Sequence, residues 1–332
     1  MKKSIRKSSY LLLVLLVSLS FAITYHVRAE EPSLSIVCTN TVLADFTSNI
    51  ITENVTIDFI MPAGACPAHF DTSPSDISKI VNADIIISLG WEPWLVNLLN
   101  KSGNTDIDEI KCSNLGEWNI PSNARTYVER ITDGLIKILT NRTALISQNA
   151  EDYLMQINQT EQELKDLVEQ AEFLDRKIIS MEWQKDFILN LGLNVTYYYA
   201  PPESLSVQDE LDVFEAASQD DVVAIVDNLQ SGTDFGSRVA SETGISHVIF
   251  TNFPGAIPGA DTYLEMISYN TDQIIKGIQT CDQLSEETKQ LENQLGSLTL
   301  QRNVFIIISI IAILFCIMLY VLYRRKDRRN II

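Results

Sequence analysis

The sequence predicts an α/β protein with two doubly wound lobes, mainly parallel sheets, one long α-helix bridging them and a C-terminal transmembrane helix. Three observations lead to this prediction. Short apolar runs alternate with amphipathic runs in two separate stretches, an uninterrupted helical pattern lies between these stretches, and a charge-free apolar segment lies near the C-terminus. Strands that alternate with helices are typical of parallel sheets whose two faces are both covered.

The two lobes are predicted over residues 30–143 and 176–280. In the first lobe we expect strands at 34–38, 55–60, 84–89 and 107–112, with helices at 43–51, 75–81 and 91–99 between them. In the second lobe we expect strands at 177–181, 195–199, 222–226 and 247–251. Each lobe has enough residues for a hydrophobic core of its own.

Residues 144–175 predict the long linking helix. They contain no proline or glycine, are rich in Glu, Gln and Leu, and carry apolar residues near helical spacing. A second polar helical segment, 281–303, reads as a stalk that leads to the apolar segment. Leu284, Leu291 and Leu298 are seven residues apart, as in a coiled coil, but three heptad positions favour a monomeric spacer, so we expect no oligomer.

Both ends of the chain indicate export and membrane attachment. Residues 1–29 combine a basic start, an apolar run and small residues before Glu30, which is the layout of a signal peptide, with an uncleaved anchor as the alternative. Residues 304–323 carry no charge and are long enough to span a bilayer. The basic tail, 324–332, then predicts a cytoplasmic C-terminus. We expect a single-pass protein of the cell membrane with most of the chain outside.

The charge of the outer part excludes one class of partner. Residues 30–301 contain 14 basic and 42 acidic residues, a net charge of −28, and such a surface repels nucleic acid. Cation steering and a solvated surface suited to a salty medium both remain open. Five Asn-x-Ser/Thr sequons are compatible with a glycoprotein: Asn54, Asn100, Asn141, Asn158 and Asn194.

The stretch 61–76, MPAGACPAHFDTSPSD, is where metal chemistry is most expected. Its three prolines and one glycine predict a loop after a strand. Cys66 and His69 lie three residues apart in this loop, and both side chains can bind metal ions. A Cys66–Cys112 disulfide is the alternative, and it would remove Cys66 as a ligand.

These features together resemble the solute-binding proteins of zinc and manganese ABC importers, in a divergent, membrane-anchored branch. The resemblance covers most of 33–280. The segments that carry it are Cys38–Asp45, Gly64–Asp71 with Pro74–Asp76, Asn82–Asp84, Trp91–Leu99, Leu191–Leu193 and Tyr263–Gly277. It implies a binding protein, not an enzyme, that works with ABC permease and ATPase subunits. No nucleophile elbow, phosphate loop or dinucleotide fingerprint occurs in the sequence.

The residues that the resemblance would assign as metal ligands differ from those of the family. The four positions that usually hold His or carboxylate ligands carry Ala68, Gly116, Met181 and Asn252 here. His69 lies one place after the first of them, and Glu182 one place after the third. The chain therefore either belongs to a divergent branch or has lost the usual site.

Three replacement sites follow from the residues near the strand ends, where doubly wound sheets bind ligands. A zinc-like or manganese-like ion would favour His69, Cys66, Glu182 and Asp227. A copper-like ion would favour the softer subset Cys66, His69 and Met181. A small polar solute would suit the amides Gln184, Asn228, Gln230 and Asn252.

Structural roles are the alternatives for several of these residues. Met181 is expected in the core more often than as a ligand, and Asn228 and Asn252 could cap or turn the chain after a strand. The leading hypothesis is an extracytoplasmic binding protein that captures a divalent metal ion, zinc or manganese, in an interlobe cleft. The alternatives are a surface receptor or adhesion module that has lost metal transport, or a binder of a small polar solute.

Overall fold

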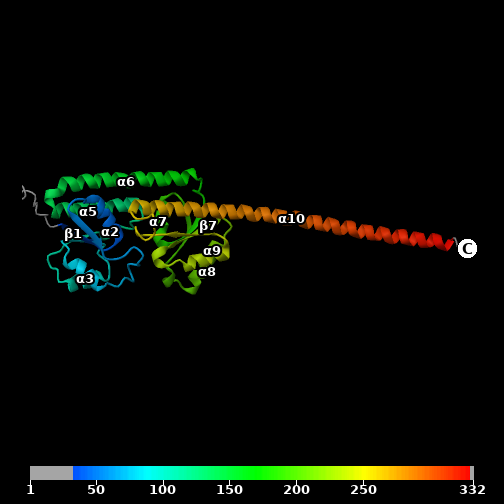
Figure 1. Cartoon of the computed structure of the whole chain (residues 1–332), viewed down its shortest axis with the longest axis horizontal. Coiled ribbons are helices and arrows are strands. Elements are labelled where there is room, and N and C mark those ends of the chain that lie inside the picture. Colours follow the sequence, from blue (N-terminus) through cyan, green and yellow to red (C-terminus); the bar gives the residue numbers. More distant parts are fainter. Residues whose placement is uncertain (1–32, 330–332) are drawn as a thin grey trace, which may run out of the picture. The chain divides into compact units, whose positions relative to one another are not determined.

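The computed structural model describes residues 33–329, and side chains up to residue 322. The predicted signal peptide and the side chains of the basic tail lie outside the described residues. The described chain divides into two compact units (Figure 1). Unit 1 comprises 33–162 and 251–267, and unit 2 comprises 163–250 and 268–329.

Unit 1 contains a four-stranded parallel sheet in the order β2-β1-β3-β4. The strands are β1 (Leu34–Cys38), β2 (Val55–Phe59), β3 (Ile85–Ser88) and β4 (Asp108–Lys111). Every residue of the inner strand β3 is buried, whereas Ile110 is the one buried residue of the edge strand β4. Continuous apolar sequence therefore marks the inner strand, as expected when both faces of a parallel sheet are covered.

The helices of unit 1 begin where the local sequence satisfies their first backbone N–H groups. Asn40 Oδ1 accepts a hydrogen bond from Leu43 N and caps α2. At the start of α3, Ser73 N donates to Asp76 Oδ2, and Pro74 occupies the first turn. The helices are α2 (Thr41–Ile50), α3 (Pro74–Val81), α4 (Leu95–Ser102), α5 (Pro121–Ile138) and the first part of α6 (Thr143–Gln170).

Unit 2 repeats the same sheet topology. Its strands, in the order β6-β5-β7-β8, are β5 (Lys177–Met181), β6 (Asn194–Tyr199), β7 (Val222–Asn228) and β8 (Ser246–Phe250). All seven residues of β7, an inner strand, are buried. The helices within 177–250 are α7 (Glu182–Asn190), α8 (Val207–Ala217) and α9 (Asp234–Thr243).

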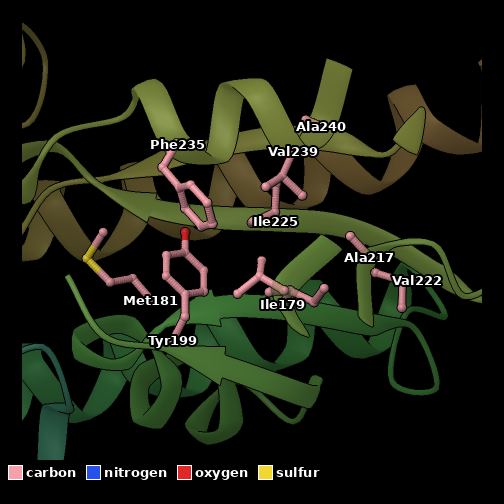
Figure 2. Close-up of a cluster of buried hydrophobic side chains, with 10 residues drawn as sticks. Ile179, Met181, Tyr199, Ala217, Val222, Ile225, Phe235, Val239 and Ala240 are labelled. Atoms are coloured by element: carbon pink, nitrogen blue, oxygen red, sulfur yellow. The ribbon is translucent and has the colours of Figure 1, made fainter. Parts of the chain in front are cut away.

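A hydrophobic cluster fills one side of the unit 2 sheet (Figure 2). Residues of β5 and β7, such as Ile179 and Ile225, pack there against Val239 of α9. The Tyr199 and Phe235 rings meet edge to face, with centroids 5.4 Å apart. This core fixes the carboxyl ends of β5, β6 and β7, where candidate ligands were predicted.

The last helix, α10 (Tyr263–Arg329), is continuous. It begins in unit 1, continues in unit 2 and runs through both the predicted stalk and the predicted span (Figure 1). Among the described residues, it is the one helix long and apolar enough to cross a membrane, with a mean hydropathy of 3.2 over its most apolar 18 residues.

The predicted fold class is confirmed: two parallel sheets with helices, and a long apolar C-terminal helix. Each predicted strand is present, with bounds that differ by no more than two residues. The helix α5 has no counterpart among the predicted elements, although its buried Ala124, Val128, Ile131 and Leu135 follow helical spacing. Residues 251–267, which the sequence placed in the second lobe, group with unit 1.

Candidate functional site

The loop after β2 in unit 1 holds Cys66 and His69 on its open part. Met61, at its start, is buried, and Asp76, at its end, caps α3. Phe70 packs edge to face on Trp94, with ring centroids 5.3 Å apart. Between these fixed points the His69 N–H donates to the Cys66 carbonyl at 3.1 Å, so the two residues lie on one turn. Cys66 is half-buried and His69 is exposed, which leaves both open to a metal ion.

The alternative of a Cys66–Cys112 disulfide is wrong in this structure. All five cysteines are free thiols. Cys112 and Cys38 are fully buried, and burial raises the pKa of each thiol to about 12. Because the thiolate is the metal ligand, these two are poor ligands, and Cys66 is the cysteine of unit 1 that stays available.

Asn252, which the resemblance assigned to the fourth ligand position, is fixed within unit 1. The Trp118 indole Nε1 donates to the Asn252 carbonyl at 2.6 Å, and Asn119 Nδ2 donates to Asn252 Oδ1 at 2.7 Å. Asn119 is buried, and its own Oδ1 has no hydrogen-bond partner in the described structure. The sequence analysis missed Asn119, the residue that follows Trp118 and orients the Asn252 amide.

Asp227, in β7 of unit 2, is enclosed by hydrogen-bond donors. Its side chain is completely buried; the Tyr199 hydroxyl donates to Oδ1 at 2.5 Å and His247 Nε2 donates to Oδ2 at 2.7 Å. Burial, and secondarily the Asp227 charge, raise the pKa of Tyr199 well above its usual value, so Tyr199 keeps the proton that it donates. A Cβ added to Gly236 would clash with Oδ2, so the α9 backbone closes the remaining side.

Neither Tyr199 nor His247 was predicted as a partner of Asp227. Strand alternation carries a partial signal, because β6 buries Tyr199 and exposes Tyr198. Nothing in the spacing of residues 199, 227 and 247 pairs them. For Asp227 to bind a metal ion, it would have to release both donors.

Met181 is the last residue of β5, and its side chain is completely buried. It belongs to the hydrophobic cluster with Tyr199 and Phe235, as Figure 2 shows. This is the core position that the sequence analysis gave as its alternative. The sulfur therefore packs among apolar groups of unit 2.

The remaining candidates of unit 2 lie just after strands β5 and β7. Glu182 is half-buried in the first turn of α7, and Gln184 is buried one residue beyond Trp183. Asn228 Oδ1 accepts from the backbone N–H groups of Gln230 and Ser231, at 2.8 and 3.1 Å. Asn228 therefore caps the turn that follows β7, which is the structural alternative that the sequence analysis gave for it. Its buried Nδ2, however, has no partner within the described residues.

The structure brings some of the predicted residues together and not others. Cys66 and His69 share one turn of unit 1, whereas Glu182 and Asp227 belong to unit 2. Over residues 33–329, no group of three or more His, Cys, Asp and Glu side chains is placed to hold a metal ion.

Comparison with known proteins finds relatives that match most of the chain. A family model described as "Zinc-uptake complex component A periplasmic" matches residues 36–277. The manganese-binding lipoprotein MntA of Halalkalibacterium halodurans is 23% identical over 280 residues, covering 75% of this chain and 90% of the relative. The metal ABC transporter substrate-binding lipoprotein SsaB of Streptococcus sanguinis is 25% identical over 308 residues, covering 80% and 97%.

Solved structures agree on the fold. The Mn-bound periplasmic metal-binding protein from Candidatus Liberibacter asiaticus aligns with a TM-score of 0.61 at 19% identity. The alignment covers 74% of this chain and 99% of that structure.

Proposed function

The chain belongs to the zinc-uptake complex component A family, as its resemblance predicted, and we propose that it captures a divalent metal ion outside the cell for an ABC importer. The match over 36–277 carries the proposal, because it includes both sheets and the loop with Cys66 and His69. Zinc and manganese are the leading candidates, and the ion is cargo rather than a resident cofactor. ABC permease and ATPase subunits are the expected partners.

For the ligands we propose the predicted residues His69, Cys66 and Glu182. What supports them is that each is at least partly exposed; Glu182 directly follows β5, and Cys66 and His69 lie in the loop that follows β2. Nitrogen, sulfur and oxygen donors of this kind suit zinc. Asp227 stays a prediction that requires Tyr199 and His247 to move away. Met181 also stays a prediction as a copper ligand. Its sulfur lies in the hydrophobic core of unit 2, so Met181 itself would have to move to reach an ion.

Isothermal titration of the detergent-solubilised chain with Zn²⁺, Mn²⁺ and Cu²⁺ tests the proposal. We expect micromolar or tighter binding, lost in His69→Ala and weakened in Cys66→Ser. Cys281→Ser is the matched control, because Cys281 is also a half-buried free thiol but lies on α10. No binding of any of the three ions would contradict the metal function and favour the receptor alternative.

A small polar solute is the second candidate, and one observation favours it. Asn228 Nδ2 is a buried donor without a partner in the described structure. Buried donors without partners are costly, so an acceptor oxygen of a solute would satisfy it. Asn228→Asp should then abolish solute binding while leaving the metal titration unchanged.

We further propose that α10 anchors the protein in the cell membrane, with unit 1 and the part of unit 2 that precedes residue 304 outside. The support is its apolar stretch, exposed along residues 304–322, followed by five basic residues in the tail. In intact cells, a membrane-impermeant maleimide should label Cys281 but not Cys316 until the membrane is dissolved. Labelling of both at the same rate would contradict the anchor.

Glycosylation is part of this proposal. All five sequon asparagines have exposed side chains: Asn54, Asn100, Asn141, Asn158 and Asn194. Intact-mass measurement of the native protein should show added mass, and replacement of each Asn by Gln should remove its share. A mass equal to that of the bare chain would contradict it.

A further inference from the structure

The part of α10 beyond the packed domain carries a row of exposed leucines on one face. Leu284, Leu291, Leu295 and Leu298 are 53, 65, 66 and 60% exposed. We call these four residues the leucine stripe. Their spacings of seven, four and three residues place them at the a and d positions of one heptad register. A sustained apolar row open to water indicates a surface that is covered in the functional protein.

The body of unit 2 leaves the leucine stripe open. Earlier on α10, Ile274 and Ile278 are completely buried, and a Cβ added to Gly277 would clash with the Val248 side chain. This side of the helix therefore rests on the sheet of unit 2. At about 100° per residue, the centre of the leucine stripe is rotated by roughly 90° from that side. A second helix can therefore lie along the leucine stripe beside the domain.

The same heptad register continues into the apolar part of α10. Its next a and d positions are Phe305, Ser309, Ala312 and Cys316, after Arg302 at the boundary. Around Ala312 and Cys316 the helix surface has a shallow, open hollow, lined also by Ile313, Ile317 and Tyr320. In lipid, small residues let two helix backbones approach closely. The a and d positions on this face of α10 are thus occupied by leucines before the apolar stretch and include small residues such as Ala312 and Cys316 within it.

We propose that this face of α10 binds a second copy of the same chain, forming a parallel two-stranded coil from Leu284 to Cys316. A second copy fits because the proposed membrane span holds both chains parallel and at the same height, so each leucine meets its own counterpart. From Leu284 to Cys316 the register spans 33 residues, and its polar a positions are Thr288, Arg302 and Ser309. This replaces the monomeric spacer expected from three leucines alone.

The charges beside the leucine stripe set a limit on this coil. Glu287 and Glu292 are at g and e positions, so Glu287 of one copy faces Glu292 of the other. Like charges there weaken the pair. Glu292→Lys converts both contacts into attractive ones, and the dimer fraction should rise.

Sedimentation of the full chain in detergent, over a dilution series, tests the proposal. We expect a dimer mass for the unchanged protein, and for Leu298→Glu a dissociation constant raised by at least about tenfold, because two buried leucines are lost per dimer. Leu300→Glu is the matched control: Leu300 is 66% exposed, two residues away and on the opposite face. A monomer at every concentration, or equal effects of the two variants, would overturn the proposal.

Cysteine cross-linking in native membranes is an independent test. With Cys66 and Cys281 replaced by Ser, mild oxidation should link two copies through Cys316. The control moves the thiol to the other face at the same depth, by Cys316→Ser with Leu314→Cys. We expect a disulfide dimer for the first protein and none for the control; equal yields would contradict this face of α10 as the interface.

Discussion

The two units share one sheet topology and differ in what their candidate ligands do. In unit 1, the loop after β2 leaves His69 exposed and Cys66 half-buried. In unit 2, Asp227 near the end of β7 is completely buried between Tyr199 and His247. Parallel topology places all strand ends at one edge, but successive side chains alternate between faces. Topology therefore locates a candidate site, and the direction of each side chain decides whether a residue can take part in it.

Replacing Asp227 should give the largest effect. Asp227→Ala leaves the buried Tyr199 hydroxyl and the partly buried His247 ring without their acceptor, so we expect the free energy of unfolding of unit 2 to fall by about 3–5 kcal/mol. Asp221→Ala is the control, because Asp221 pairs with Lys177 on the surface and such exposed pairs contribute little to stability. Denaturant unfolding followed by tryptophan fluorescence measures both. Equal midpoints for the two variants would show that the buried network is dispensable.

The positions of the strands and of the His69 loop could be predicted from the sequence better than the contacts of the candidate ligands. Strand positions followed from runs such as 85–88 and 222–226, because an inner parallel strand must be apolar on both faces. The exposed loop with His69 followed from its prolines and glycine. These are local signals, each carried by consecutive residues.

The pairing of Asp227 with Tyr199 and His247 could not be predicted in this way. The three residues come from three strands, and their contact depends on the relative register of β6, β7 and β8. The same is true of Asn119, which reaches Asn252 across 133 positions of sequence. The site residues that sequence reasoning missed are those fixed by tertiary packing.

Unit 1 has a partly buried carboxylate, Asp45, which should make stability depend on pH. Burial raises the pKa of Asp45 to about 6, against opposing hydrogen bonds from the Tyr263 N–H and the Tyr153 hydroxyl. The pKa of Asp45 is higher in the folded protein than in the unfolded chain, so protonated Asp45 stabilises the folded state. This contribution to the free energy of unfolding is fully present below about pH 4 and is lost as the pH rises through 6. We expect a loss of roughly 3 kcal/mol across that window.

The difference between the unchanged protein and Asp45→Asn isolates this effect, since asparagine cannot titrate. Thermal unfolding at half-unit steps from pH 4 to 7 should show the unchanged protein losing stability relative to the variant as pH rises. A constant difference over the whole window would show that Asp45 has the same pKa in both states.

Two glycine substitutions, one in each unit, compare the units through smaller changes in stability. Gly236→Ala places a methyl group against the Asp227 carboxylate, so we expect a loss of about 1–3 kcal/mol from overpacking. Gly64→Ala, in the open loop of unit 1, has no heavy atom within 4 Å of the new methyl group and should be nearly neutral. Combining Gly236→Ala with Asp227→Ala should cost less than the sum of the two changes. If the losses of stability in the two single variants add fully, the close approach of the α9 backbone to the Asp227 carboxylate does not constrain α9.

Replacing His69 is expected to have the smallest effect on stability. This substitution therefore separates an effect on metal binding from an effect on folding. The side chain is exposed and makes no hydrogen bond that holds the loop; the contact with Cys66 uses the His69 backbone N–H. His69→Ala should therefore change the free energy of unfolding by no more than about 0.5 kcal/mol. In the presence of Zn²⁺ the outcome should differ, because a bound ion stabilises the folded protein in proportion to its affinity. The unchanged protein should melt at a higher temperature with the ion, and His69→Ala should not. Equal zinc-induced shifts for both proteins would remove His69 from the site, whereas a variant that already melts lower without zinc would make His69 a structural residue of unit 1.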